Sequence, residues 1–143
     1  MTRVSVLYQD DSYGKEGLDG VRQALARRGL KPASEGGYMR GTTAVKAALL
    51  DVRLGEPQAI VMIGTYDPEA AFVRWARKLG LDCVFVSISF VGSSRLAAAL
   101  GPEGNGVMVT QVVPFPWDSS IPVVAQFQVA LAAFDPDAKP GFL

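Results

Sequence analysis

The chain has 143 residues, 49% of them hydrophobic, and its 14 basic and 14 acidic side chains cancel. This length fits one domain with one core, over residues 1–143, and the composition is typical of a folded globular chain. The balanced charge provides no basic face, so we expect neither nucleic acid nor an anionic membrane as a partner.

No apolar stretch reaches the roughly 18 residues that cross a bilayer, and the first residues lack the layout of an export signal. The chain has no histidine, which excludes histidine-based catalytic sites and the common zinc sites. Its single cysteine, Cys83, begins an apolar run, so we expect a buried, inert thiol. We expect no cofactor and no metal.

Short runs rich in valine and isoleucine alternate with segments of helical period, which is typical of a parallel sheet covered on both faces. In chain order, strands buried on both faces are predicted at residues 4–8, 33–38, 59–63, 83–88 and 107–113. Helices are predicted at residues 15–28, after Thr42 and Thr43, from Asp67 to Leu79, at residues 93–100, and from Pro122.

The helix ends and buried faces can also be predicted. Asp11 or Ser12 is expected to cap the first helix and Asp67 the third, with Pro68 in its first turn. Gly29 fits the left-handed position that closes the first helix. The side chains expected to turn inward from the third and fifth helices are Phe72, Trp75, Ala76 and Leu79, and Val124, Phe127, Leu131 and Phe134.

This alternation predicts an α/β fold: a doubly wound three-layer sandwich around a five-stranded parallel sheet of order 2-1-3-4-5. Ligands of such sheets bind beyond the carboxyl ends of the strands, near the point where the strand order reverses. The segments expected there are residues 10–14, 39–43, 64–67, 87–92 and 111–118.

Acidic side chains at this edge leave one alternative open. Asp10, Asp11 and Asp67, with Ser87 or Ser89, are similar to the site of a response-regulator receiver domain, which binds magnesium and accepts a phosphoryl group. The lysine that receivers place after the fifth strand is absent from "VMVTQVVPFPW". The phosphate-binding loop and the dinucleotide fingerprint are absent as well.

Two tyrosines are more informative than the acids. Tyr13 and Tyr66 each follow a strand, and these strands are neighbours in a 2-1-3 order. Each alone also fits a packing role, but as a pair they are expected to offer aromatic faces and hydroxyl groups to a small molecule. Phe115 and Trp117 are expected on the same side, as a rigid loop or as an apolar contact that needs a partner.

Four stretches resemble, in order and spacing, the second lobe of the type I periplasmic solute-binding proteins, the kind that serve branched-chain-amino-acid-type ABC transporters. They are "SVLYQDDSYGKEGLDGVRQAL", "IVMIGTYDPEAAFVRWARKLG", "FVSISFVGSSRLAAALG" and "GVMVTQVVPFP". The family's Tyr-Gly after an acidic turn is matched by Tyr13 and Gly14, and its Gly-x-Tyr segment by residues 64–66. Its ligand segment after the fourth strand is matched by residues 87–92. The resemblance implies four ligand contacts: Tyr13, Tyr66, Ser89 and Phe90.

The resemblance also implies a function. The chain would be one lobe of a two-lobed substrate-binding component of an ABC-type uptake system, located in the periplasm, with the permease as a partner. The missing first lobe would grip the ligand's carboxylate, and the abrupt end of the chain fits a cut from something longer. Effector-binding regulatory domains share this architecture and stay open as an alternative, whereas no nucleophile or proton-transfer pair indicates an enzyme.

Ser89 departs from the family pattern. Members that bind aliphatic amino acids place a carboxylate there to pair with the ligand's ammonium, and a hydroxyl cannot replace that charge. A standard α-amino acid is therefore in doubt unless the other lobe or Asp67 supplies the anion, and a carboxylate, an aromatic acid or an amide fits equally well. Ser89 also fits a packing role. An isolated lobe would expose its aromatic rim, so we expect it to self-associate.

Overall fold

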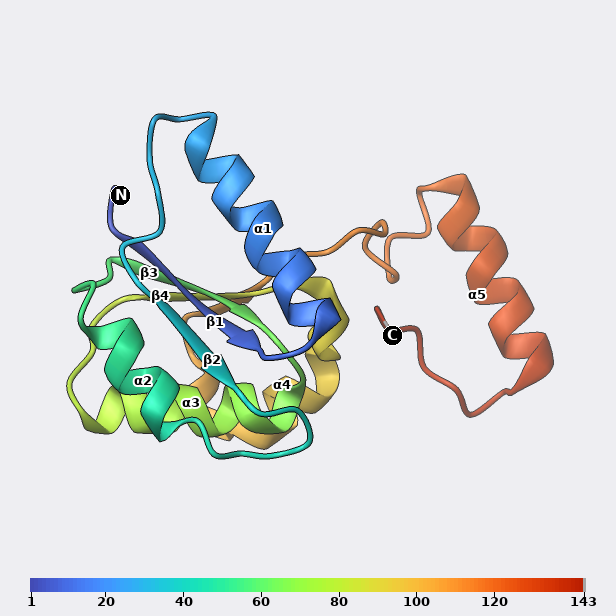
Figure 1. Ribbon diagram of the computed structural model, residues 1–143. Helices are drawn as coiled ribbons and strands as arrows, with labels where there is room; N and C mark the ends of the chain where they lie inside the picture. Colours follow the sequence, from blue (N-terminus) through green and yellow to red (C-terminus); the bar gives the residue numbers. More distant parts are fainter. Residues whose placement is uncertain (143) are drawn as a thin grey trace.

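The computed structural model describes residues 1–142 of the chain. Its centre is a sheet of parallel strands in the order β2-β1-β3-β4-β5, which confirms the predicted order (Figure 1). The strands are β1 (Val4–Gln9), β2 (Glu35–Tyr38), β3 (Ala59–Ile63), β4 (Val84–Ser87) and β5 (Val107–Val109).

Helices alternate with these strands. They are α1 (Ser12–Ala26), α2 (Lys46–Arg53), α3 (Tyr66–Lys78), α4 (Ser93–Leu100) and α5 (Pro122–Phe134), with 3₁₀ turns at Ser89–Val91 and Gly101–Gly104. Helix α1 covers one face of the sheet, and α2, α3 and α4 cover the other (Figure 1). Within residues 1–142, none of the helices has the length and apolar character needed to cross a membrane.

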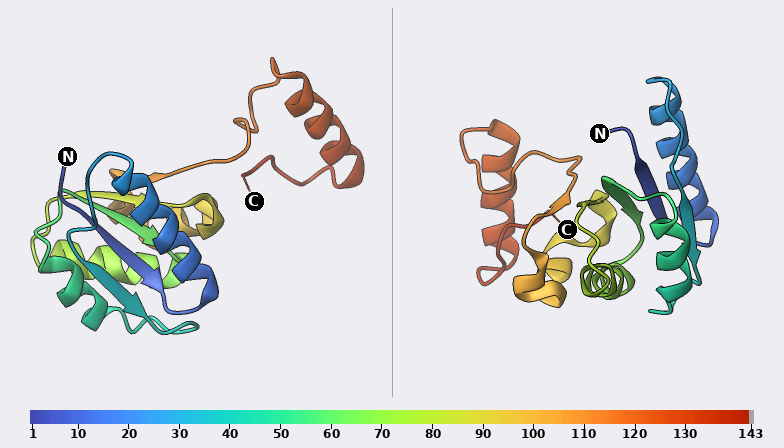
Figure 2. Two further views of the ribbon diagram at one scale, coloured as in Figure 1. Left: turned by 45° about the horizontal axis from the view of Figure 1, so that its top comes forward. Right: turned by 90° about the vertical axis from the view of Figure 1, so that its left-hand side faces the viewer.

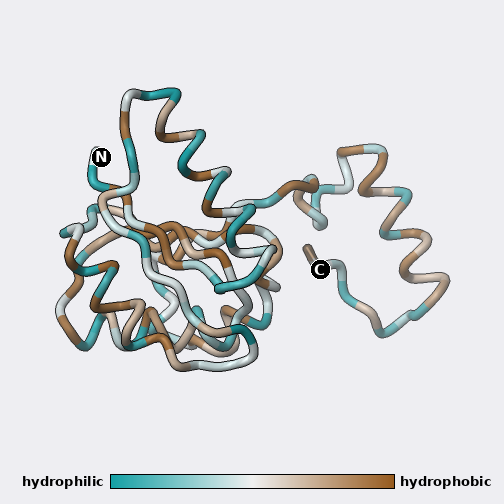
Figure 3. Tube along the Cα trace, in the orientation of Figure 1, coloured by the Kyte–Doolittle hydropathy of each residue, from teal (hydrophilic) through white to brown (hydrophobic). Residues whose placement is uncertain are grey.

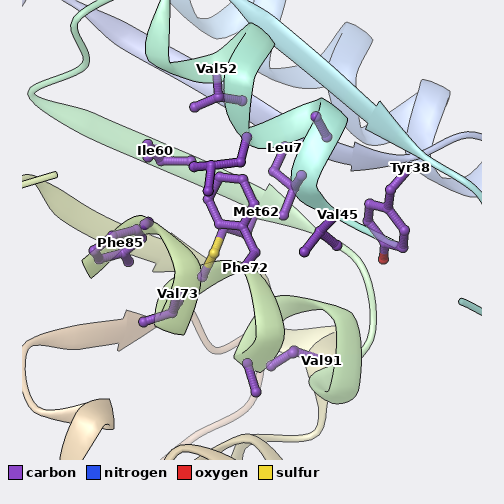
Figure 4. Close-up of a cluster of buried hydrophobic side chains, with 14 of the residues drawn as sticks. Leu7, Tyr38, Val45, Val52, Ile60, Met62, Phe72, Val73, Phe85 and Val91 are labelled. Atoms are coloured by element: carbon purple, nitrogen blue, oxygen red, sulfur yellow. The ribbon is translucent and has the colours of Figure 1, made fainter. Parts of the chain in front are cut away.

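The main core lies between the sheet and α2, α3 and α4. Leu7 and Met62 leave the sheet toward Phe72 of α3, and all three side chains are fully buried (Figure 4). On the opposite face Val6 packs with Leu18 of α1. The central strands β1 and β3 are mainly hydrophobic (Figure 3) because both of their faces are covered.

The fifth strand is shorter and more exposed than predicted. Val6, Val61, Val86 and Met108 form one row across the sheet, on the face that α1 covers. Val6 is fully buried beneath α1, whereas Met108 of β5 is 52% exposed. The prediction of burial on both faces is therefore wrong for β5, because α1 does not reach this edge of the sheet.

Helix α5 does not cover the sheet. Figure 1 and the left view of Figure 2 show it apart from the sheet, beyond the segment that leaves β5. Only Val124 of the four predicted inward side chains is buried, and Phe134 is 90% exposed. The helix is instead tied to the segment before it, where Gln128 Nε2 donates to the carbonyl of Pro116 at 2.9 Å.

One predicted helix start is wrong. Thr65 has the extended backbone of an N-cap (φ −107°, ψ 164°), so Asp67 lies inside the first turn of α3 and does not cap it. Helix α2 follows Thr42 and Thr43 and begins three residues after Thr43. The Thr42 hydroxyl donates to the carbonyl of Met39 at 2.9 Å and organises the turn after β2.

Three side chains predicted to be buried are partly exposed. Trp75 and Leu79 are 37% and 41% exposed. The Trp75 ring lies on the surface under Lys46 and Lys78, whose Nζ atoms are 4.1 Å and 5.1 Å from its centroid. Cys83 is half-buried, and burial raises the pKa of its thiol to about 11.

Candidate functional site

A hollow of about 350 Å³ lies at the carboxyl edge of the sheet, where the strand order reverses. The segments that follow β1, β2, β3 and β4 all contribute to it, and its volume suits part of a small molecule. Its lining residues are Gln9, Asp11, Ser12, Tyr13, Arg40, Gly41, Thr65 and Phe90. A larger hollow lies at the opposite edge, between the carboxyl ends of α2 and α3, where sheets of this type do not bind ligands.

The turn between β1 and α1 fixes one wall of the hollow. Asp11 has extended backbone and caps α1, because its Oδ1 accepts the Gly14 N–H at 3.0 Å. Its Oδ2 accepts from Gln9 Nε2 at 2.6 Å. The hydrogen bond from Gly14 lowers the pKa of Asp11, so the carboxylate is ionised. Any Cβ at Gly14 would collide with the Gln9 carbonyl, so the tight turn that positions Tyr13 requires glycine.

Tyr13 and Phe90 form an aromatic wall. Their ring centroids are 4.9 Å apart and the planes are tilted by 46°. Tyr13 is half-buried, and its hydroxyl oxygen is shielded from solvent with no hydrogen-bond partner among residues 1–142. Burial, and then the neighbouring Glu69, raise the pKa of Tyr13 to about 12, so the phenol is neutral.

The four residues predicted to contact a ligand are not all brought together. Tyr13 and Phe90 line the hollow. Tyr66 opens α3 outside it, and its hydroxyl accepts from Arg95 Nη1 at 3.1 Å. Ser89 is half-buried in the 3₁₀ turn beside Phe90. Ligand contact by any of the four stays a prediction.

Phe115 and Trp117 lie apart from the hollow. Their rings are 4.9 Å apart, and Trp117 meets Phe142 edge to face at 5.6 Å. The three rings form a small cluster beside α5, and none of them lines the hollow.

A buried polar cluster lies behind the aromatic wall, and sequence analysis missed it. Glu69 is fully buried, and its Oε2 accepts from Ser87 Oγ at 2.6 Å. Its Oε1 and the hydroxyl of Tyr38 have no hydrogen-bond partner among the described residues. Burial raises the pKa of Glu69 to about 8, against the opposing effect of the Ser87 hydrogen bond, so the carboxyl is mainly neutral at pH 7. One signal could have revealed it, because Glu69 lies three residues before Phe72 on the buried face of α3.

The acidic residues of the receiver hypothesis each have a different environment in the structure. Asp10 pairs with Lys15 at 2.8 Å on the surface. Asp11 caps α1, and Asp67 is exposed in the first turn of α3. The structure therefore gives the receiver hypothesis no support.

The fold and the position of the hollow are typical of α/β modules that bind small molecules at the carboxyl edge of a parallel sheet. The chain belongs to the periplasmic binding protein family, whose model matches residues 1–141. An amino acid binding protein of Pseudomonas aeruginosa is 29% identical over 110 residues, which are 76% of this chain and 29% of that protein.

Solved structures agree with this membership. A possible leucine/isoleucine/valine-binding protein from Rhodopirellula baltica is 34% identical, with a TM-score of 0.90 over 99% of this chain and 39% of that one. A substrate-binding periplasmic protein from Ralstonia solanacearum is 32% identical, with a TM-score of 0.80 over 95% of this chain and 39% of that one. The chain therefore spans about two-fifths of the length of these structures and less of the Pseudomonas relative.

Proposed function

We propose that this chain is one lobe of the substrate-binding component of an ABC-type uptake system, and that it works in the periplasm with a permease as partner. The main support for this proposal is the family match over residues 1–141, together with the hollow at the point where the strand order reverses. The printed names of the relatives, an amino acid binding protein and a possible leucine/isoleucine/valine-binding protein, support a small polar ligand.

The hollow would supply one side of the ligand site. Tyr13 and Phe90 offer an aromatic surface, and Gln9 and Thr65 add polar groups at its edge. A second lobe closing over this surface would enclose the ligand, which we propose to be an amino acid, a related carboxylate or an aromatic acid. Tyr66 and Ser89, beside the hollow, would contact the ligand on closure.

Tyr13 provides the direct test. Replacement of Tyr13 with alanine removes the ring that packs against Phe90 and is expected to weaken ligand binding at least about fivefold, since an aromatic contact contributes about 1 kcal/mol beyond its buried area. Asp11→Ala is the matched comparison, because both Asp11 oxygens already accept hydrogen bonds from within the protein. It is expected to lower the free energy of unfolding by about 1 kcal/mol, with a smaller effect on affinity.

Calorimetric titration with leucine, glutarate and benzoate would measure binding, and urea unfolding would measure stability. Affinity unchanged by Tyr13→Ala but lost with Asp11→Ala would assign the site to the acids instead and contradict the proposal.

A further inference from the structure

We infer that the hollow receives a carboxylate of the ligand, and that Arg40 is the residue of this chain that binds it. The inference rests on the proposed function and specifies the ligand's chemistry on this side of the site. Sequence analysis did not single out Arg40, which follows β2 and lines the hollow together with Tyr13 and Phe90.

Within residues 1–142, the Arg40 guanidinium makes no side-chain hydrogen bond. Its side chain is 77% exposed, and its contact with a carboxylate is to Asp11 Oδ2 at 3.7 Å, which is beyond hydrogen-bonding distance. Arginine carries five N–H donors in a planar fork that matches a carboxylate in a bidentate arrangement. These donors are therefore available to a ligand.

Asp11 does not neutralise Arg40 effectively. Its two oxygens already accept from the Gly14 N–H and from Gln9 Nε2, and the first of these bonds lowers its pKa most. The negative charge of Asp11 is thus balanced mainly at the positive amino end of α1. The positive charge of Arg40 is left facing the hollow.

The rest of the lining also favours an anion over an ammonium. Thr65 is the N-cap residue of α3, and its hydroxyl makes no capping hydrogen bond, so the positive end of this helix adjoins the hollow. Asp67 does not line this hollow but an adjoining smaller one, which shares Gly41 and Thr65 with it. Ser89, in the 3₁₀ turn beside Phe90, carries no charge. The ionised Asp11 also lines the hollow, but both of its oxygens already accept hydrogen bonds, whereas a ligand carboxylate could accept from the Arg40 guanidinium.

The test compares probes that differ in charge but little in shape. The ¹⁵N-labelled chain is titrated with benzoate and benzamide, with glutarate and glutaramide, and with leucine, and the Arg40 Nε–Hε signal is followed by NMR. We expect each carboxylate to bind at least about tenfold more tightly than its amide and to shift the Arg40 signal, because a hydrogen bond to a charged group contributes about 1.5–3 kcal/mol. Added salt should weaken the carboxylates selectively.

Three variants complete the experiment. Arg40→Gln should remove the preference for carboxylate over amide, Arg40→Lys should retain part of it, and Arg53→Gln, at the opposite edge of the sheet, should leave it unchanged. Binding of leucine or the amides at the affinity of the acids, unaffected by Arg40→Gln, would overturn this inference and leave the proposed function intact. Failure of every probe to bind would overturn both.

Discussion

Replacing Glu69 with glutamine is expected to stabilise the folded chain at neutral pH. Glu69 is fully buried, and burial raises the pKa of its carboxyl from 4.5 to about 8. Folding at pH 7 must therefore return a proton to a group that is ionised in the unfolded chain. Glutamine has nearly the same shape and keeps an oxygen to accept the Ser87 hydrogen bond, but it needs no proton.

The magnitude follows from the difference between the two pKa values. Because the pKa is higher in the folded state, the stability is complete below the unfolded value and is lost as the pH rises toward the folded value. Each pH unit in that interval lowers the free energy of unfolding by about 1.4 kcal/mol. The interval from 4.5 to about 8 then corresponds to a loss on the order of 5 kcal/mol, of which about 3 kcal/mol has occurred by pH 7.

Urea unfolding followed by circular dichroism, at several values from about pH 5 to pH 8, measures this effect. The difference between Glu69→Gln and the parent chain cancels the contributions of all other groups and should grow by about 1 kcal/mol per pH unit. Glu16→Gln, on the exposed face of α1, is the control and should show no such growth. A difference that is independent of pH would refute the assignment of a neutral, buried carboxyl.

Two further predictions concern packing. A Cβ at Gly64 would collide with the buried Tyr38 hydroxyl, so Gly64→Ala should lower the free energy of unfolding by about 1–3 kcal/mol, and Tyr38→Phe in the same chain should restore most of it. A double-mutant cycle in urea would show the coupling, and additive effects would contradict the collision. Met108 and several apolar side chains of α5 are exposed, Met108 at the edge of the sheet that α1 does not cover. These exposed apolar surfaces should make the isolated chain self-associate. Sedimentation velocity should show an average mass that rises with concentration and falls back in Met108→Glu, whereas a monomer at every concentration would contradict this.

The sheet could be predicted from the sequence because its strands carry the signal themselves. In β1 and β3 adjacent side chains such as Val6 and Leu7 are both fully buried on opposite faces, and this produces an uninterrupted apolar run. Right-handed crossovers then leave few strand orders, and the predicted one is confirmed. The N-cap at Asp11 could also be predicted from the sequence, because capping depends on local backbone geometry and a short polar side chain.

The location of α5 could not be predicted in the same way. An apolar helix indicates that some surface must cover it, but the pattern does not specify which surface. The sequence therefore identified Val124 and Phe134 as apolar positions, and the structure buries the first against its own segment while the second is 90% exposed. The same limit applies to β5, because the burial of Met108 depends on whether a helix covers that edge.

The charged groups near the hollow could be predicted only in part from the sequence, because their partners depend on the three-dimensional arrangement. The acids that stand out in the sequence, Asp10 and Asp11, are balanced by Lys15 and by the start of α1. Glu69 is a buried carboxyl without a charged partner among the described residues, and its burial is tolerated because Ser87 of β4 donates to it and because it stays protonated. Arg40 has the opposite environment, since it is charged at the surface and its contact with Asp11, at 3.7 Å, is longer than a hydrogen bond. Asp10 and Asp11 are therefore balanced by groups close in sequence, whereas the state of Glu69 depends on a partner from another element. The same comparison of partners supports the proposed anion-binding role of Arg40, which follows β2.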